Sequence, residues 1–284
     1  MIDDWLPGRR ISTRGRKKVV FATGVMSRSG EALRQFGGFT RYLENNFGYS
    51  GGGLGEGGAT GTDFLEVSYH SRAVAGAWQP APYEAHHCEV GLGQATVEVV
   101  RNLDWYRARL PDDTVYHLVG YSLGGVTLFE AAARLLETAP TRWQGRLGAL
   151  ITLSAPLFGA DLGVEGDLLS MLGFGVLVPG GEAVRELIAR GRNSTHRGDI
   201  EHRAARLRAA GVQILTLADA DDVVVTPEDA IIAPASERDR HVLTSPRVPL
   251  GDPGNNPFGH GPLLRNTLAW VRMARLIGPQ EPRP

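Results

Sequence analysis

The sequence has too little cysteine and too short apolar runs for several large classes of protein. Cys88 is the only cysteine among 284 residues, so an internal disulfide and a cysteine-rich metal site are both excluded. We interpret this lone thiol as a small packed side chain rather than a nucleophile. The longest apolar run is far shorter than the roughly 18 to 20 residues of a spanning helix. We therefore expect no integral membrane segment.

Lysine is nearly absent, and the charges of the chain balance. Lys17 and Lys18 are the only lysines among 30 basic residues, and 31 acidic residues bring the formal net charge to −1. This balance excludes a global field that would attract nucleic acid or an anionic membrane. The aromatic residues also lack the interleaved basic residues of a nucleic-acid stacking surface. With 42% hydrophobic and 21% charged residues, the composition is typical of a globular protein.

The N-terminal stretch resembles an export signal only superficially. The pair Arg9-Arg10 is followed by the apolar run 19–22, which is shorter than the 7 to 15 apolar residues that a signal peptide needs. We expect residues 1–17 to form a solvated leader and the protein to be cytoplasmic.

Apolar runs alternate with helical periodicity, which predicts a mostly parallel sheet with helices on both faces. Short strands are expected at 18–22, 64–69, 114–119, 147–153 and 212–217. Helices are expected at 33–47, 92–110, 126–136, 182–189, 200–210 and 263–277. Residues 78–83, which contain several prolines, are expected to form a loop. The sequence shows neither an internal repeat nor a linker, so we predict a single α/β domain over 18–278.

Two segments interrupt this alternation. Residues 51–61 include seven glycines, with Gly53, Gly55 and Gly58 in the spacing of a dinucleotide-binding turn. That turn requires a strand before it and a helix after it, and here the order is reversed, so we expect no such cofactor. Residues 157–210 are long for one crossover connection. We favour a lid or cap insertion there over a merely longer crossover.

The strongest chemical motif is Gly120-Tyr121-Ser122-Leu123-Gly124-Gly125, between an expected strand and an expected helix. A hydroxyl is a poor nucleophile at neutral pH unless a strained turn exposes it beside a base. Flanking glycines allow such a turn, and the helix that follows directs its N–H groups at the same point. Ser122 is therefore the candidate nucleophile.

In these motifs the chain resembles the α/β-hydrolase superfamily, and more narrowly its serine esterases and lipases. The resemblance extends from Lys18 to Ile277. It rests on the segments Val19–Val25, Val119–Gly125, Leu153–Gly159, Asp222–Pro227 and Gly259–Leu264. It implies an α/β-hydrolase fold with the chain order nucleophile, acid, histidine.

A histidine must take the serine proton and return it to the leaving group. His260 lies in a glycine- and proline-rich loop before the last helix, where the resemblance implies the base, and His241 is its competitor. We expect His117, within an apolar strand, to be packed. His86 and His87 lie upstream, in a loop or helix start.

An acid should orient the imidazole. Three aspartates follow the strand 212–217, and Asp222 matches the pattern of family lipases through Pro227. Asp221 is the alternative, and Asp219 is interpreted as a turn residue.

The tetrahedral intermediate needs two preorganised donors. The N–H of Leu123 directly follows the nucleophile. The resemblance places the second donor after the first strand, at Val25 or alternatively at Met26. Many relatives have His-Gly at that turn, whereas this chain has Thr23-Gly24. Because the donor is a backbone group, the change is compatible with the reaction.

These residues predict a serine hydrolase that cleaves carboxylic esters through an acyl-enzyme on Ser122. Acyl transfer or thioester hydrolysis by the same triad, and a non-catalytic binding member of the fold, are the alternatives. We expect a small ester or lipid substrate, with 157–158 and 168–178 as candidate linings of an acyl pocket. No metal site and no cofactor are expected. The oligomeric state is not predicted.

Overall fold

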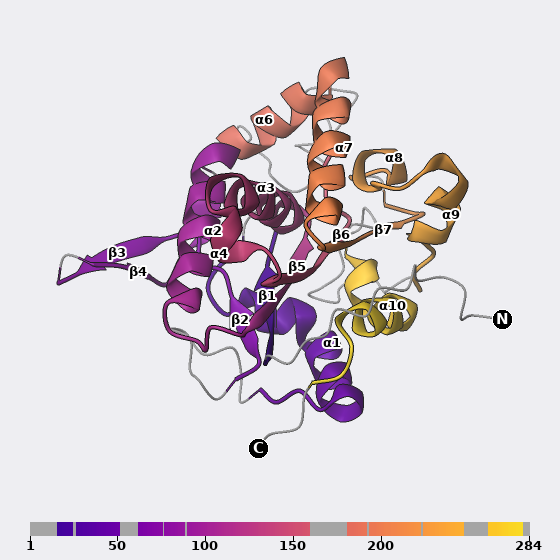
Figure 1. Cartoon of the computed structure of the whole chain (residues 1–284). Helices are drawn as coiled ribbons and strands as arrows, with labels where there is room; N and C mark the ends of the chain where they lie inside the picture. The colour runs from indigo at the N-terminus through magenta and orange to yellow at the C-terminus, as the bar shows by residue number, and fades with distance from the viewer. Residues whose placement is uncertain are drawn as a thin grey trace.

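The central feature of the fold is a parallel six-stranded sheet (Figure 1). The structure, a computed structural model, describes residues 16–24, 27–51, 62–75, 77–88, 90–159, 181–191, 193–222, 224–246 and 261–280. The strand order is β2-β1-β5-β6-β7-β8, and all five neighbouring pairs are parallel. The strands are β2 (Phe64–Glu66), β1 (Lys17–Ala22), β5 (Val115–Tyr121), β6 (Leu147–Leu153), β7 (Gln213–Asp219) and β8 (Val242–Leu243). The predicted mostly parallel sheet is therefore confirmed.

Helices cover both faces of this sheet, as the periodicity predicts (Figure 1). One face carries α2 (Leu92–Arg107), α3 (Leu123–Thr138), α4 (Pro140–Trp143), α6 (Glu182–Gly191) and α7 (Ser194–Ala209). The other face carries α1 (Glu31–Phe47), η4 (Pro262–Arg265) and α10 (Thr267–Ile277). The shorter elements are η2 (Ala85–Cys88), α8 (Pro227–Ala230), η3 (Ala235–Glu237) and α9 (Arg238–His241).

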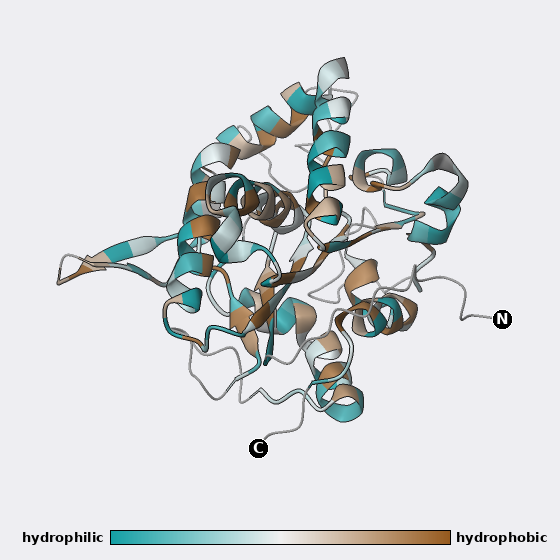
Figure 2. Cartoon of the chain, in the orientation of Figure 1, coloured by the Kyte–Doolittle hydropathy of each residue, from teal (hydrophilic) through white to brown (hydrophobic). Residues whose placement is uncertain are grey.

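Burial explains why the central strands are mostly apolar and do not alternate with polar residues. Every residue of β1, β5 and β6 is buried, because helices pack on both sides of them. Figure 2 shows the same distribution, with hydrophobic residues in the central strands and a largely hydrophilic α7 at the periphery. Among the described residues, no helix combines the length and apolar character that crossing a membrane requires.

Two sequence expectations near β2 are wrong. The strand ends at Glu66, not at residue 69, because the Asn102 side chain of α2 bonds both the N–H (3.1 Å) and the carbonyl (2.7 Å) of Ser68. Only residues 81–83 of the expected loop 78–83 lie outside helices and strands, because residues 78–80 belong to the strand β4 (Ala77–Pro80), which forms a hairpin with β3 (Ser71–Val74). Proline is tolerated there because it ends a strand outside the main sheet.

The expected last helix 263–277 is also divided. The Asn266 side chain accepts the N–H groups of Leu268 (3.0 Å) and Ala269 (3.3 Å), which caps α10 and ends η4 before it. In the same way the Asn193 side chain accepts from the N–H of Thr195 (3.0 Å), so α7 begins at Ser194 rather than at residue 200.

The segment expected to be a lid falls partly outside the described residues, at 160–180. Its described helices pack on the body of the protein. Glu186 of α6 accepts the N–H of Leu92 at 3.1 Å. On α3, Glu130 pairs with Arg190 of α6 (3.0 Å) and with Arg203 of α7. In this part of the segment α7 is the crossover helix between β6 and β7.

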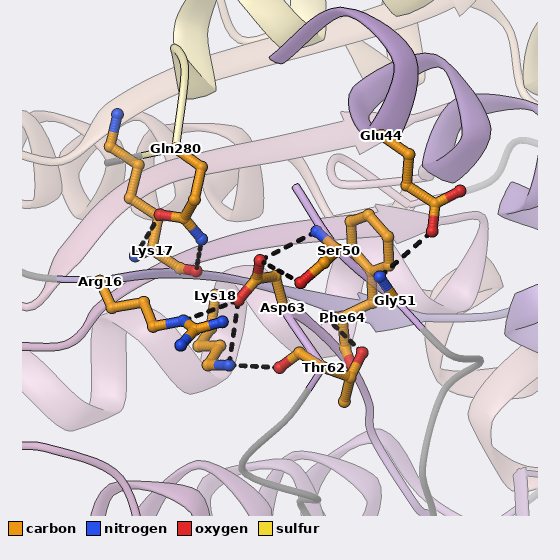
Figure 3. Close-up of polar contacts among 10 residues, drawn as sticks. All are labelled: Arg16, Lys17, Lys18, Glu44, Ser50, Gly51, Thr62, Asp63, Phe64 and Gln280. Atoms are coloured by element: carbon orange, nitrogen blue, oxygen red, sulfur yellow. Dashed lines mark hydrogen bonds and ion pairs between the residues drawn. The ribbon is translucent and has the colours of Figure 1, made fainter. Parts of the chain in front are cut away.

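The first strand begins one residue earlier than expected, within the stretch assigned to a leader. Lys17 opens β1, and Arg16 forms an ion pair with Asp63 at 2.9 Å, so neither belongs to a solvated leader. Asp63 also pairs with Lys18 at 3.2 Å, and both side chains are 1% exposed (Figure 3). Ser50 donates its N–H to the same carboxylate at 3.0 Å. Residues 1–15 lie outside the described residues.

Lys17 connects the same strand to the end of α10. Its Nζ donates to the carbonyls of Ile277 (3.0 Å) and Pro279 (2.8 Å). Its backbone exchanges two hydrogen bonds with the Gln280 side chain, at 3.0 and 2.8 Å (Figure 3). A compact ammonium with three donors suits two closely spaced carbonyls better than a planar guanidinium does. Both lysines of the chain are therefore structural.

We predict that Asp63→Asn lowers the free energy of unfolding by about 3–5 kcal/mol at pH 7, because it leaves the buried Lys18 ammonium without its counter-charge. Burial raises the pKa of the Asp63 carboxyl, but its hydrogen bonds and the charge of Lys18 outweigh burial and hold that pKa below the ordinary value. The carboxylate therefore stabilises the fold above the ordinary aspartate pKa, and this contribution is lost as the pH falls through the lowered one. Urea denaturation at pH 7 and pH 3 should show the difference between wild type and variant shrinking in acid. The exposed Asp113→Asn is the control, and an equal effect of both variants would contradict the prediction.

Candidate active site

Ser122 lies at the junction of β5 and α3 in a strained backbone conformation. Its φ of 53° and ψ of −129° are rare for a residue with a side chain and cost about 1–3 kcal/mol. The surrounding backbone holds this conformation. The Ser122 N–H donates to the carbonyl of Leu153 at 3.0 Å, and its carbonyl accepts the N–H of Gly125 at 3.0 Å. Such strain is typical of a side chain that the fold presents for chemistry.

The glycines around Ser122 permit backbone contacts that any side chain would block. A β-carbon on Gly120 would lie 2.5 Å from the Cα of Gly125. One on Gly124 would lie 2.4 Å from the carbonyl oxygen of Ala22, at the end of β1. These distances are far below van der Waals contact, so α3 can begin this close to β1 and β5 only with glycine at both positions.

The loop after β1 faces the Ser122 hydroxyl. A β-carbon on Gly24 would lie 3.0 Å from Ser122 Cβ, 3.3 Å from Ser122 Oγ and 3.6 Å from Cε1 of Tyr121. The absence of a side chain at Gly24 therefore keeps the space beside the Ser122 hydroxyl open. This is the loop in which the sequence predicts a second oxyanion donor, but Val25 and Met26 lie outside the described residues.

The first donor position, Leu123, is the first residue of α3 and is 1% exposed. N–H groups in the first turn of a helix have no acceptor within the helix. The helix has 16 residues, and its dipole favours negative charge at this end. The N–H of Leu123 is thus available, next to the serine, to a developing negative charge.

The aspartates after β7 differ sharply in burial. Asp222 is 4% exposed, and its Oδ1 accepts the N–H groups of Val224 (2.9 Å) and Val225 (3.0 Å). Asp221 is exposed, and its N–H donates to Oδ1 of Asp219 at 3.1 Å. The interpretation of Asp219 as a turn residue is wrong, because it is the buried last residue of β7 and pairs with Leu243 of β8. A buried carboxylate held by backbone donors can orient an imidazole, whereas an exposed one is screened by water, which favours Asp222 over Asp221.

The negative charge of Asp222 acts on the phenol of Tyr121, the residue before Ser122. Burial, and after it the negative charge of Asp222, raises the pKa of Tyr121 well above its ordinary value. Ser122, Tyr121 and Asp222 thus belong to one region, at the carboxyl ends of β5 and β7.

His260, the predicted base, lies outside the described residues. The chain resumes at Gly261, and Leu263 of η4 packs in the hydrophobic cluster that also holds Tyr121 and Leu217. The segment directly after His260 therefore packs on the face of the sheet that α1 and α10 cover. The assignment of the base remains a prediction.

The other histidines considered have different surroundings. His241 is buried, and its Nδ1 lies 2.7 Å from the carbonyl of Thr216 on β7, a strand separated from β5 by β6. The imidazole is thus bound to the backbone of a strand two positions away from the one that leads to Ser122. His117 is packed as predicted, and burial together with the charge of Lys17 lowers its pKa to about 3. His86 and His87 lie in η2.

The described residues form no group of three histidine, cysteine or carboxylate side chains that could hold a metal. Two cavities lie among them. One, of about 340 Å³, lies between α3, α4 and α7, and the other, of about 230 Å³, lies beneath β4 beside α2. Neither is lined by Ser122. Leu157 and Phe158, proposed linings of an acyl pocket, are core residues, with Arg197 stacked 3.8 Å from the Phe158 ring centre. Residues 168–178 lie outside the described residues.

Sequence reasoning missed the contributions of Gly24 and Tyr121. In the sequence, Gly24 is only part of a turn that differs from the relatives, and Tyr121 is only the variable position of the serine motif. Each lies close to Ser122 or Asp222 because separate strands end at the same edge of the sheet. A single sequence carries no spacing signal for such a contact.

We predict that Gly24→Ala slows the reaction of Ser122 with a fluorophosphonate about tenfold or more. The new methyl group would crowd the hydroxyl, and displacing packed atoms costs about 1–3 kcal/mol. Intact-mass measurement of the labelled fraction over time tests this. Gly93→Ala, in α2, is the matched control because its new β-carbon would meet nothing within 4 Å. Equal labelling of wild type and Gly24→Ala would show that the space in front of the hydroxyl is not required.

Comparison with known proteins finds similarity in structure but not in sequence. No protein-family model matches the chain, and no curated protein matches it. Among solved structures, the mature form of lipase BlEst2 from Bacillus licheniformis has a TM-score of 0.51 at 15% identity, over 93% of both chains. Its propeptide form has a TM-score of 0.52 at 15% identity, over 95% of this chain and 52% of that one.

Phospholipase PlaB from Legionella pneumophila has a TM-score of 0.50 at 15% identity, over 74% of this chain. The match spans only 40% of the length of PlaB. Identity this low establishes the fold alone. With its parallel sheet and its strand–serine–helix junction, the chain has an α/β-hydrolase fold.

Proposed function

We propose that this protein is a serine hydrolase that cleaves carboxylic esters through an acyl-enzyme on Ser122. The observation that carries the proposal is the strained Ser122 backbone, with its hydroxyl facing the loop at Gly24. A fold maintains strain at a serine when the exposed hydroxyl is needed. The lipase BlEst2 and phospholipase PlaB, which share the fold, are named for ester hydrolysis, which is consistent with this class of substrate.

In the proposed mechanism, Ser122 Oγ attacks the acyl carbon while His260 accepts its proton. Asp222 orients the imidazole and stabilises its charged form. The N–H groups of Leu123 and Val25 stabilise the negative oxygen of the tetrahedral intermediate. The intermediate collapses, the carbon–oxygen bond to the alcohol breaks, and His260 protonates the departing alcohol. His260 then activates a water molecule, which releases the acid and regenerates Ser122.

We predict that a fluorophosphonate labels the wild-type protein once, and that Ser122→Ala and His260→Ala both abolish labelling. Phosphonylation requires the serine oxygen and is accelerated by the base that removes its proton. Intact-mass spectrometry measures the reaction. His241→Ala is the control for the base and should label at the wild-type rate. Absence of labelling in folded wild type would contradict the proposal and favour a non-catalytic member of the fold.

We predict that Asp222→Asn lowers kcat for a short-chain p-nitrophenyl ester by about 10³–10⁴-fold, whereas Asp221→Asn changes it less than threefold. An amide at the orienting position leaves the imidazole in the wrong tautomer, and the loss in a serine triad is of this size. The two variants make the same chemical change at adjacent positions, so each is the control of the other. A larger loss in Asp221→Asn would move the acid to that residue without affecting the role of Ser122.

Product analysis in the presence of an added alcohol separates hydrolysis from acyl transfer, since both pass through the same acyl-enzyme. Release of the free acid alone supports the hydrolase. Formation of a new ester with the alcohol would reassign the enzyme to acyl transfer.

A further inference from the structure

A chain of buried hydroxyl groups lies behind the loop that faces Ser122. The Thr23 hydroxyl donates to Ser27 Oγ at 2.6 Å, and the Ser27 hydroxyl donates to the carbonyl of Gly24 at 2.6 Å. Thr23 has thereby used its single hydrogen, so the Tyr83 hydroxyl, 3.0 Å from Thr23 Oγ1, is the donor in that contact. The chain thus runs in one direction, from Tyr83 through Thr23 and Ser27 to the carbonyl of Gly24.

The backbone of Tyr83 holds the other end of the same loop. Its N–H donates to Ser29 Oγ at 2.7 Å, and its carbonyl accepts the N–H of Ser29 at 3.0 Å. Tyr83 therefore contacts the loop at Thr23 with its hydroxyl and at Ser29 with its backbone.

A second tyrosine connects the loop to the helix that follows the serine. The Tyr69 hydroxyl donates to the carbonyl of Thr23 at 3.2 Å and lies 3.1 Å from Oγ1 of Thr127, in α3. The rings of Tyr69 and Tyr83 meet edge to face, with centres 5.4 Å apart. Tyr69 is 3% exposed, Tyr83 2% and Thr127 0%, so water cannot replace these bonds easily. Hydroxyl chains in such a setting strengthen one another.

The hydroxyl network ends at the carbonyl of Gly24, which connects it to the candidate active site. A trans peptide is planar, with its carbonyl and its N–H on opposite sides. The Ser27 hydroxyl therefore holds the plane of the Gly24 carbonyl, in the loop that faces the Ser122 hydroxyl. Val25, the proposed second oxyanion donor, directly follows Gly24 in the sequence. A donor contributes to catalysis only when it is aligned before the charge develops.

We propose that Tyr83 and Tyr69 are positioning residues that align the loop after β1 for stabilisation of the oxyanion. The inference rests on the proposed function and adds to it the groups that preorganise one donor. Neither tyrosine touches the substrate in this proposal. Their effect passes through Thr23, Ser27 and the Gly24 peptide.

The test uses Tyr83→Phe and Tyr69→Phe, which keep the aromatic rings and remove only the hydroxyls. Removing an oxyanion donor outright costs about 10²–10³-fold in rate. Misalignment should cost part of this, so we expect kcat for a p-nitrophenyl ester to fall about tenfold or more while KM changes less than twofold. The rate of fluorophosphonate labelling should fall in parallel, because the same loop faces its phosphoryl oxygen.

Tyr49→Phe is the matched control. Tyr49 is also buried, at 4% exposed, and its hydroxyl bonds a backbone carbonyl, that of Gly278, at 3.1 Å. It lies at the opposite end of β1, beside the Asp63 ion pairs. A general loss of stability should affect the melting temperatures of the control and test variants alike, whereas the fall in kcat should appear only in the tyrosines that hold the loop.

Thr23→Val removes the hydroxyl that accepts the hydrogen bond of Tyr83. This variant replaces Tyr83→Phe in the test if a tyrosine variant does not fold. In the double variant Thr23→Val with Tyr83→Phe, kcat should fall no further than in the worse single variant, since both remove one chain of bonds. The inference would be overturned if Tyr83→Phe or Thr23→Val kept the wild-type kcat. It would also be overturned if the losses multiplied in the double variant. Neither result would contradict the proposed function, provided that Ser122 is still labelled. A wild type that does not label at all would overturn the proposed function and this inference with it.

Discussion

The close approach of α3 to the ends of β1 and β5 is the constraint on which the candidate site depends. Gly124 lies against the backbone of Ala22, and Gly120 lies against Gly125. A side chain at either position would push the helix away from the sheet. With the helix start held this close, the connecting residue Ser122 adopts a φ of 53°, and its hydroxyl emerges beside Gly24. Packing between helix and sheet therefore imposes the local strain that presents the candidate nucleophile.

Strand β1 connects the stability of the fold to this site. Its first residues, Lys17 and Lys18, bind carbonyls and the buried carboxylate of Asp63, which attaches the strand to β2 and to the end of α10. Its last residues lead into the loop at Thr23 and Gly24, held by the hydroxyl chain from Tyr83. The contacts at the first end are charged, whereas those at the second are between neutral hydroxyls and carbonyls.

Local sequence patterns predicted the strands and helices well where both faces of an element are buried. The strand 147–153 agrees with the structure residue for residue, because a strand buried on both faces is almost entirely apolar. Prediction failed where a single side chain from elsewhere ends an element. Asn102 of α2 withdraws Ser68 from β2, and Asn266 divides the last helix. Neither effect has a periodicity, because each depends on one hydrogen-bonding group that tertiary packing brings close.

The sequence by itself determined the fold class, the parallel arrangement of the strands and the candidate serine at the end of one of them, because these follow from hydrophobic periodicity and from glycines at fixed spacing. Tertiary structure alone decided that Asp222 is buried while Asp221 is exposed, and that Gly24 faces the Ser122 hydroxyl. It also brought Tyr69 and Tyr83 to Thr23, across 46 and 60 residues of sequence. Burial and contact between distant segments are properties of packing in three dimensions, and the order of residues along one chain does not encode them locally.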